Sequence, residues 1–271
     1  MAEKASSPPC SSPASQGGPR RRPAAGAGAA IARSGPRAFA RSYGRKRGRS
    51  TSARQLALLE RLLPTLAIQL DAAPPPRLAE ALFRTAQDVW LEIGFGGGEH
   101  LLWQARANPA IGFIGCEPFQ DGLIKALSAI ERERLANIRL YAEDARYLLE
   151  WLPPASIGRA FLLFPDPWPK RRHHKRRLVS VATLGELARI LRPGSQLRIA
   201  TDIGEYARSI SEAVARQGSF ACSGQSPAPL PLPQPFAAFS GPRPADWPPT
   251  RYEQKALREG RQCNYFCFWR R

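Results

Sequence analysis

The chain has 271 residues and a formal net charge of +18, from 40 Lys and Arg residues against 22 Asp and Glu residues. This length can bury a hydrophobic core, and the basic balance indicates a polyanionic partner, nucleic acid before an acidic membrane surface. No apolar segment is long enough to span a bilayer and no signal-peptide core is present, so we expect a cytoplasmic protein. The five cysteines are scattered and odd in number, which indicates reduced thiols, and we expect no metal site.

The first 40 residues are predicted to be a disordered basic tail, because Pro, Ala, Gly and Ser dominate them without apolar periodicity. Residues 1–54 contain twelve Lys or Arg residues against the single acid Glu3, which is 12 − 1 = +11. Such a tail usually acts as a solvated arm that contacts polyanions without sequence preference. We expect residues 41–271 to form one folded domain.

Two helical segments open this domain. Leucines recur at helical spacing from Ala53 to Leu70, with Pro64 as a kink or break. After a proline linker, Leu78–Ala86 is predicted as a second, short helix.

Strands and helices then alternate along the chain. The predicted strands are Val89–Gly94, Ile111–Cys116, Ile138–Ala142, Ala160–Phe164 and Gln196–Ala200. The predicted helices are Glu99–Ala107, Phe119–Glu133, Ala145–Trp151, Leu178–Leu191 and Ile203–Gln217. This alternation predicts an α/β fold with a doubly wound, mostly parallel sheet that is covered on both faces.

The C-terminal part departs from this alternation. Residues 223–249 contain nine prolines and are predicted to be an extended surface loop. Arg251–Glu259 is predicted as a short helix, and Thr250 and Glu253 before and within it have the spacing of a capping box. The aromatic segment Cys263–Trp269 is predicted as a closing strand, antiparallel to its neighbours.

The stretch Phe161–Arg177 combines an apolar strand with a proline-rich loop and eight consecutive Lys, Arg or His residues. Three prolines within five positions fix φ and remove backbone donors, so we expect a rigid loop that is not helical. The loop carries one carboxylate, Asp166, and one large aromatic, Trp168, and the cations begin at Lys170. A stiff acidic loop beside a basic run is suited to bind a negatively charged polymer and to hold one of its bases in place.

An acidic residue stands at or near the carboxyl end of each strand in the alternating region, which is where open α/β sheets bind ligands. These acids are Glu92, Glu117, Asp144, Asp166 and Asp202. A glycine-rich turn also follows the first strand, and there a ligand can approach the backbone closely. Its candidate ligand contacts are Gly94, Gly96 and Gly98.

The glycine turn differs from the nicotinamide fingerprint, because G-x-G-x-x-G would need glycine where Glu99 stands. An acidic rim also suits a pyrophosphate poorly. It fits S-adenosylmethionine, which carries a sulfonium, an amine and a ribose diol. In this interpretation Glu117 holds the ribose hydroxyls and Asp144 lies at the adenine end of the cofactor.

Structural interpretations of the same residues stay open at this point. Glu92 can be a buried strand acid paired with a cation, and Asp144 can cap the following helix. Asp202 can cap another helix with Glu205 at the N3 position. The basic run 170–177 can be a solvated face.

Several motifs of the chain resemble those of bacterial tRNA (guanine-N7)-methyltransferases, which have the Rossmann-like class I S-adenosylmethionine-dependent fold. They are LEIGFGGGEHL at 91–101, IGCEP at 114–118, AEDA at 142–145, FPDPWPKRRHHKRRL at 164–178, RIATD at 198–202 and TRYEQKALREG at 250–260. The PDPWPK motif with its basic run is highly specific. The resemblance begins at about Phe39 and does not include the tail or the length of the 223–249 insert.

The resemblance implies methylation of N7 of the variable-loop guanine, position 46, of tRNA, with Asp166 at the catalytic position. It implies cofactor contacts by the strand-end acids Glu92, Glu117, Asp144 and Asp166. It implies tRNA contacts at Lys170, Asp202, Thr250, Arg251, Tyr252 and Glu253.

Guanine N7 has an exposed lone pair and no proton, so its methylation needs positioning and negative charge rather than a general base. Two alternative functions are compatible with parts of the same pattern. An adenine exocyclic-amine methyltransferase is disfavoured by the extra proline before Asp166 and by the basic run behind it. A non-catalytic RNA-binding protein is disfavoured by the intact glycines and the complete series of acids.

Overall fold

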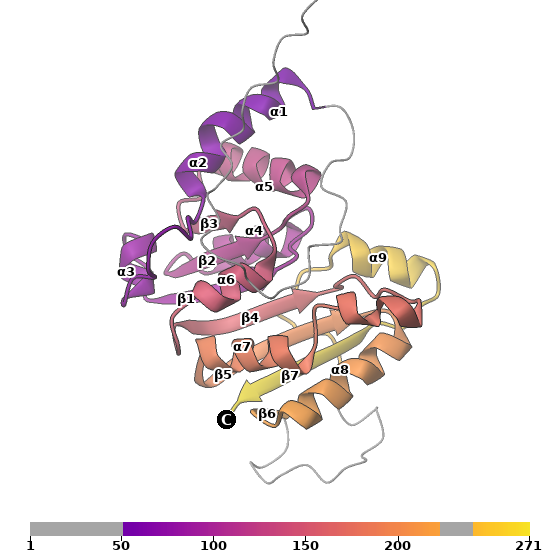
Figure 1. The fold of residues 1–271 in the computed structure, drawn as a ribbon. Helices are drawn as coiled ribbons and strands as arrows, with labels where there is room; N and C mark the ends of the chain where they lie inside the picture. Colours follow the sequence, from indigo (N-terminus) through magenta and orange to yellow (C-terminus); the bar gives the residue numbers. More distant parts are fainter. Residues whose placement is uncertain (1–50, 223–240) are drawn as a thin grey trace, which may run out of the picture. The chain divides into compact units, whose positions relative to one another are not determined.

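The computed structural model describes residues 51–222 and 241–271 (Figure 1). The predicted tail 1–40 and residues 223–240 of the predicted proline-rich loop lie outside the described residues. The described chain contains a seven-stranded sheet in the order β3-β2-β1-β4-β5-β7-β6.

The strands confirm the predicted fold class. They are β1 Asp88–Ile93, β2 Ile111–Cys116, β3 Ile138–Tyr141, β4 Ile157–Leu163, β5 Leu191–Thr201, β6 Phe220–Cys222 and β7 Asn264–Arg270. The first five pair in parallel, whereas β7 lies antiparallel to both β5 and β6. The short strand β6 was not predicted, because three residues are too few to show an alternating pattern.

Helices cover both faces of the sheet (Figure 1). They include α4 Glu99–Ala107, α5 Gln120–Glu133, α6 Ala145–Trp151, α7 Val181–Ile190, α8 Gly204–Gln217 and α9 Arg251–Arg258. Side chains of α4 and α5 form one apolar cluster, and those of α6, α7 and α8 form a second. The strand order reverses between β1 and β4, which makes their carboxyl ends the expected ligand site of a doubly wound sheet. None of the helices in the described part of the chain is long and apolar enough to cross a membrane.

The first predicted helix is divided and shorter than expected. It consists of α1 Ala53–Ala57, a π-helical turn at Leu58–Leu62 and α2 Leu63–Leu66. Pro64 lacks a backbone donor and crowds the preceding turn, which accounts for the widened turn. The helix ends before the predicted Leu70, because Ile68 donates its N–H to the Leu140 carbonyl at 2.9 Å and pairs with the edge of the sheet.

The second helix, α3 Leu78–Leu82, also ends before its predicted limit at Ala86. Phe83 adopts an extended conformation, and its ring packs over Gly112 so closely that a Cβ there would lie 2.4 Å from it. Tertiary packing therefore ends this helix, and the local sequence pattern does not show it.

The proline-rich loop 165–169 has no regular structure, as predicted, and a 3₁₀-helix, Arg171–Arg176, follows it. The 3₁₀-helix was not predicted. Its six residues are all Lys, Arg or His, so the sequence offers no apolar period to indicate a helix.

Candidate active site

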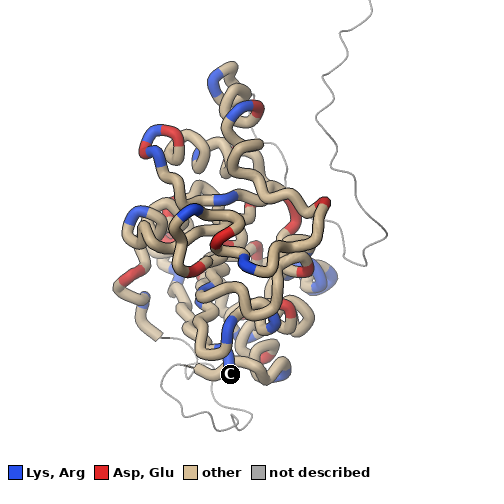
Figure 2. Tube along the Cα trace, turned by 90° about the vertical axis from the view of Figure 1, so that its left-hand side faces the viewer, with Lys and Arg blue, Asp and Glu red and all other residues tan. Residues whose placement is uncertain are grey.

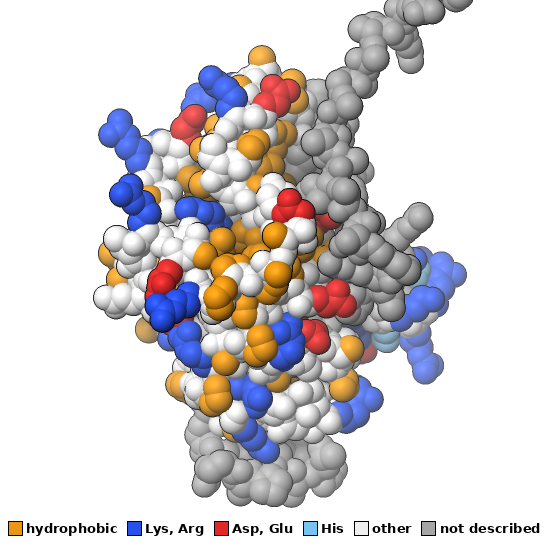
Figure 3. Space-filling view, turned by 60° about the vertical axis from the view of Figure 1, so that its left-hand side comes forward, with side chains coloured by type: hydrophobic (Ala, Val, Ile, Leu, Met, Phe, Trp, Pro, Cys, Tyr) orange, Lys and Arg blue, Asp and Glu red, His pale blue; other side chains and the backbone are white. Residues whose placement is uncertain are grey.

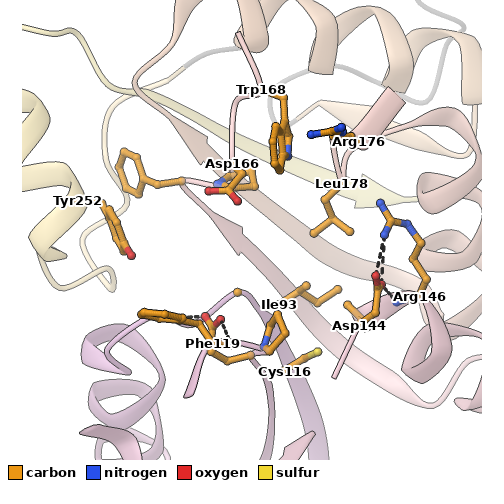
Figure 4. Close-up of a pocket in the computed structure, with 17 residues that line it drawn as sticks. Ile93, Cys116, Phe119, Asp144, Arg146, Asp166, Trp168, Arg176, Leu178 and Tyr252 are labelled. Carbon is orange, nitrogen blue, oxygen red and sulfur yellow. Dashed lines mark hydrogen bonds and ion pairs between the residues drawn. The ribbon is translucent and has the colours of Figure 1, made fainter. Parts of the chain in front are cut away.

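A pocket of about 380 Å³ opens at the carboxyl ends of β1, β2, β3 and β4 (Figure 4). Three carboxylates that follow successive strands line it together: Glu117 after β2, Asp144 after β3 and Asp166 after β4. Gly94 and Gly96 of the turn after β1 line it as well. These three of the five strand-end acids therefore share one pocket, because parallel strands end at the same edge of the sheet.

Glu117 is nearly buried, with 7% of its surface exposed, and it organises the glycine turn. Its Oε2 accepts the Gly96 N–H at 2.8 Å and its Oε1 accepts the Phe119 N–H at 2.9 Å. Burial raises the pKa of the Glu117 carboxyl, and these two backbone hydrogen bonds oppose the shift. Each oxygen keeps a further lone pair that can accept a hydrogen bond from a hydroxyl group of a ligand in the pocket.

Asp144 caps a helix and also lines the pocket, so its predicted contact with the cofactor stays a prediction beside the confirmed cap. It is the N-cap of α6 and accepts the Arg146 N–H at 3.0 Å, and it also lines the pocket. The Arg146 guanidinium donates to Asp144 Oδ2 at 2.9 Å, and both side chains form one end of the pocket (Figure 4). Capping and ligand contact are therefore compatible at this position.

Asp166 lies in a strained loop on the wall of the pocket (Figure 4). Phe164 and Trp168, two residues to either side of Asp166, have φ values of +52° and +42°, which side chains other than glycine rarely adopt. Such strain concentrates at functional sites. Asp166 is exposed, yet the protein atoms packed beside its carboxyl raise its pKa above the usual value by desolvation.

Trp168 stands beside Asp166 on the same wall and is held by the 3₁₀-helix (Figure 4). The guanidinium carbon of Arg176 lies 5.0 Å from the Trp168 ring centroid, and the His173 ring meets the indole edge-on at 5.9 Å. The basic run therefore packs against the wall of the pocket as well as extending into solvent.

The start of α9 closes the other end of the pocket, where Tyr252 lies (Figure 4). Thr250 is the N-cap of α9 and accepts the Glu253 N–H at 3.2 Å. Only this half of the predicted capping box forms, because the Glu253 carboxylate accepts from the Tyr265 hydroxyl and pairs with Arg243. The Arg251 side chain pairs with Glu99, 3.6 Å away, beside the glycine turn.

Segment 241–250 is anchored to the sheet before it enters α9. Both carboxylate oxygens of Asp246 accept from Arg198 Nη1 at 2.8 Å, and Trp247 next to it is 3% exposed. Trp247 lies within the predicted surface loop, so this end of that loop contributes to the core instead.

Comparisons with known proteins agree with this geometry. Residues 86–265 match the family described as "Putative methyltransferase". The chain is 45% identical over 233 residues to a protein of Ruegeria sp. (strain TM1040) named tRNA (guanine-N(7)-)-methyltransferase, a match that covers 84% of this chain and 87% of that protein. A protein of the same name from Agrobacterium fabrum is 43% identical over 229 residues, covering 84% and 94%. The chain belongs to the tRNA (guanine-N(7)-)-methyltransferase family.

Among solved structures, the 16S rRNA methyltransferase KamB superimposes with a TM-score of 0.47 at 18% identity, covering 73% of this chain and 95% of KamB. A score this low carries no argument about function. The assignment to the tRNA (guanine-N(7)-)-methyltransferase family follows from sequence identity over most of the chain.

Two residues predicted to contact the cofactor lie outside the pocket lining: Glu92, which the resemblance implies, and Gly98, a candidate from the glycine turn. Glu92 is 3% exposed and accepts from His100 Nδ1 at 2.7 Å, which is the buried pairing that the sequence left open. Gly98 is the N-cap of α4 with φ +84°, a position that favours glycine. Their contacts with a cofactor stay predictions.

Of the residues implied in tRNA binding, only Tyr252 lines the pocket, whereas Lys170, Asp202, Thr250, Arg251 and Glu253 lie outside its lining. Asp202 accepts from Arg261 Nε at 2.8 Å, and the N-cap of α8 is Ile203, so the capping interpretation of Asp202 is wrong. Lys170 is exposed and immediately precedes the 3₁₀-helix. Their contacts with tRNA stay predictions.

The structure also adds pocket residues that the sequence interpretation missed. Phe119, Arg146 and Leu178 line the pocket, each one to four residues from a motif residue that was singled out. Each of them lies just after a strand end or the basic run, and this position was the sequence signal that could have identified them as pocket residues. Tertiary packing alone shows which of these neighbours turn inward.

Proposed function

We propose that this protein transfers a methyl group from S-adenosylmethionine to N7 of guanine 46 in the variable loop of tRNA. One observation carries the proposal: Glu117, Asp144 and Asp166 line a single pocket in a chain 43–46% identical to relatives named tRNA (guanine-N(7)-)-methyltransferase. The pocket and the family resemblance support the same chemistry independently.

The pocket residues fit S-adenosylmethionine in chemistry. The Glu117 carboxylate suits a ribose diol, and the apolar side chains of Ile93, Phe119 and Leu178 suit the faces of an adenine. Asp144, at the opposite end of the pocket from Tyr252, would lie at the adenine end. When bound, S-adenosylmethionine supplies an electrophilic methyl group on a sulfonium.

In the proposed mechanism, Asp166 does not remove a proton. Its carboxylate accepts hydrogen bonds from the guanine edge, which holds N7 in line with the methyl group. The same negative charge stabilises the purine as it becomes cationic. The prolines beside Asp166 and the packed Trp168 keep the carboxylate in place without reorganisation during the reaction.

The exposed cations beside the loop suit the phosphates of tRNA. Lys170, Arg171, Arg172 and Lys175 are all exposed. Lys and Arg side chains gather with His side chains at one edge of the molecule in Figure 3. Phosphate contacts of this kind contribute affinity and orientation, while the pocket selects the base.

Incubation of the protein with labelled S-adenosylmethionine and bulk tRNA, followed by nucleoside mass spectrometry, tests the proposal. We expect 7-methylguanosine as the labelled product. N6-methyladenosine would instead support the exocyclic-amine alternative. Binding of tRNA without any labelled nucleoside would support a non-catalytic RNA-binding protein.

We predict that Asp166→Ala lowers turnover by about 100- to 1,000-fold or more, because it removes the preorganised negative charge. Affinity for tRNA should change little, since exposed cations supply most of it. Single-turnover methylation and a filter-binding assay with the same tRNA separate the two effects. Asp166→Asn keeps the shape of the side chain, and near wild-type methylation by it would refute the electrostatic role.

A further inference from the structure

Arg177 ends the basic run but differs from the rest of it in its surroundings. It is 5% exposed, whereas Lys170, Arg171, Arg172 and Lys175 are exposed. A buried guanidinium cannot reach a phosphate on the surface of the molecule. Arg177 therefore needs a different explanation from the cations that precede it.

The Arg177 guanidinium contacts three residues in two other parts of the chain, the proline-rich loop and α8. Its Nε donates to the Pro167 carbonyl at 2.8 Å. Its Nη1 donates to Glu205 Oε1 at 3.1 Å, and its Nη2 donates to the other oxygen of the same carboxylate. Its guanidinium carbon lies 4.7 Å from the ring centroid of Tyr206, which is fully buried. The planar group is thus held on two edges and one face.

The Pro167 carbonyl is the important one of these partners, because it directly follows Asp166. Pro165, Pro167 and Pro169 have no backbone N–H, so this loop can be held mainly through its carbonyls. The positive φ values at Phe164 and Trp168 are strained for residues other than glycine, and such strain persists only where the surroundings enforce it. The Arg177 guanidinium, which Glu205 of α8 holds in place, supplies such a constraint at the centre of the loop.

We propose that Arg177 is a positioning residue that holds the loop carrying Asp166 in its strained conformation, with Glu205 of α8 as its support. The proposal rests on the proposed role of Asp166 in methyl transfer. Arg177 acts on the reaction through the Pro167 carbonyl and does not bind tRNA phosphates.

Arginine and lysine differ in what they can do at this position. Lysine is a competent phosphate ligand but has no planar fork with which to donate to Pro167 and to both Glu205 oxygens at once. Arg177→Lys therefore separates the two roles. A phosphate contact would survive the substitution, and the positioning role would not.

We expect Arg177→Lys to lower the single-turnover rate by about tenfold to 100-fold at saturating tRNA and cofactor, because a small misplacement of a reacting group has effects of this size. The slope of log Kd for tRNA against log salt should stay at its wild-type value. Lys175→Gln should reduce that slope by about 0.7, the amount for one lost contact to a single strand. Arg208→Lys, on an exposed position of α8, is the matched control and should keep the wild-type rate.

Amide hydrogen exchange over residues 164–170 supplies a readout that does not depend on activity. We expect faster exchange at Phe164, whose N–H donates to the Ala200 carbonyl at 2.8 Å, in Arg177→Lys and unchanged exchange in Arg208→Lys. If Arg177→Lys does not fold, Glu205→Ala provides the second variant, since the Glu205 side chain is 53% exposed. It should also lower the rate and speed exchange in the loop.

The proposal is overturned if a folded Arg177→Lys or Glu205→Ala methylates at the wild-type rate with wild-type exchange. It is also overturned if Arg177→Lys lowers the salt slope as Lys175→Gln does. Failure of the proposed function has a different signature, the absence of 7-methylguanosine with the wild-type protein. In that case the exchange comparison still decides whether Arg177 holds the loop.

Discussion

Burial raises the pKa of Asp166, although its side chain still opens on solvent. The proposed chemistry uses the ionised carboxylate, so activity should fall as the pH decreases through this raised pKa. We predict an acid limb in the single-turnover rate with its midpoint above the usual aspartate value of about 3.9. A pH profile at saturating tRNA and cofactor measures it, and Asp166→Asn should retain only a low rate without that limb.

Glu117 has a raised pKa for the same reason and supplies a control for this assignment. It is predicted to bind the cofactor, so its protonation should weaken cofactor binding and affect kcat/KM for the cofactor. Saturating cofactor removes that contribution from the rate. An acid limb seen in kcat/KM alone would assign the titration to Glu117 and contradict the role of Asp166.

At the scale of elements, α5 sets the position of the glycine turn. A Cβ on Gly122 would lie 2.2 Å from the Gly96 carbonyl oxygen and 3.2 Å from Glu117 Cγ. Both the turn and the buried carboxylate would have to move. We predict that Gly122→Ala weakens cofactor binding by about tenfold or more, because overpacking costs about 1–3 kcal/mol. Calorimetric titration with S-adenosylhomocysteine measures this change.

Gly185→Ala is the matched control, since this glycine lies within α7 and nothing stands within 4 Å of its added Cβ. It should raise the free energy of unfolding by about 0.5–1 kcal/mol through helix propensity and leave cofactor binding unchanged. Equal cofactor affinity of Gly122→Ala and the wild type would show that the turn does not depend on this contact.

The elements that could be predicted are those whose burial produces a regular pattern. Glu99–Ala107, Ile111–Cys116 and Ala145–Trp151 have the predicted limits, because apolar patterns define them locally, and Gly98 and Asp144 are the N-caps of the two helices. The early ends of the first helix and of α3 depend on contacts with strands far along the chain. The local sequence pattern does not indicate such contacts.

The same distinction holds within the candidate site. The shared pocket of Glu117, Asp144 and Asp166 could be predicted, because each acid follows a parallel strand and such strands end together. The different surroundings of Lys175 and Arg177 could not be predicted from the sequence. Both are cations in one run, and only the tertiary fold buries the second against Tyr206 and Glu205.

At the scale of the whole molecule, positive charge is unevenly divided between the tail and the described domain. Residues 1–50 contain eleven Lys or Arg residues and one acid, a charge of +10, which leaves 18 − 10 = +8 for residues 51–271. Lys and Arg positions are interspersed with Asp and Glu positions over the described chain (Figure 2). Residues 51–271 therefore supply oriented cations, and residues 1–50, which comprise the predicted tail and positions 41–50, supply a large share of the net charge.

This division predicts that the tail contributes to tRNA affinity but not to the chemical step. Arg20, Arg21 and Arg22 are consecutive in the tail, and their replacement by Gln should lower the salt slope of tRNA binding by up to about 2. The single-turnover rate at saturating tRNA should stay unchanged, because the proposed chemistry uses Asp166 and, among the described residues, those that line the pocket all lie after residue 90. Filter binding between 50 and 200 mM salt, roughly the range over which phosphate contacts lose most affinity, measures the slope. A reduced rate at saturation would place the tail in the catalytic complex, and an unchanged slope would exclude these arginines from tRNA binding.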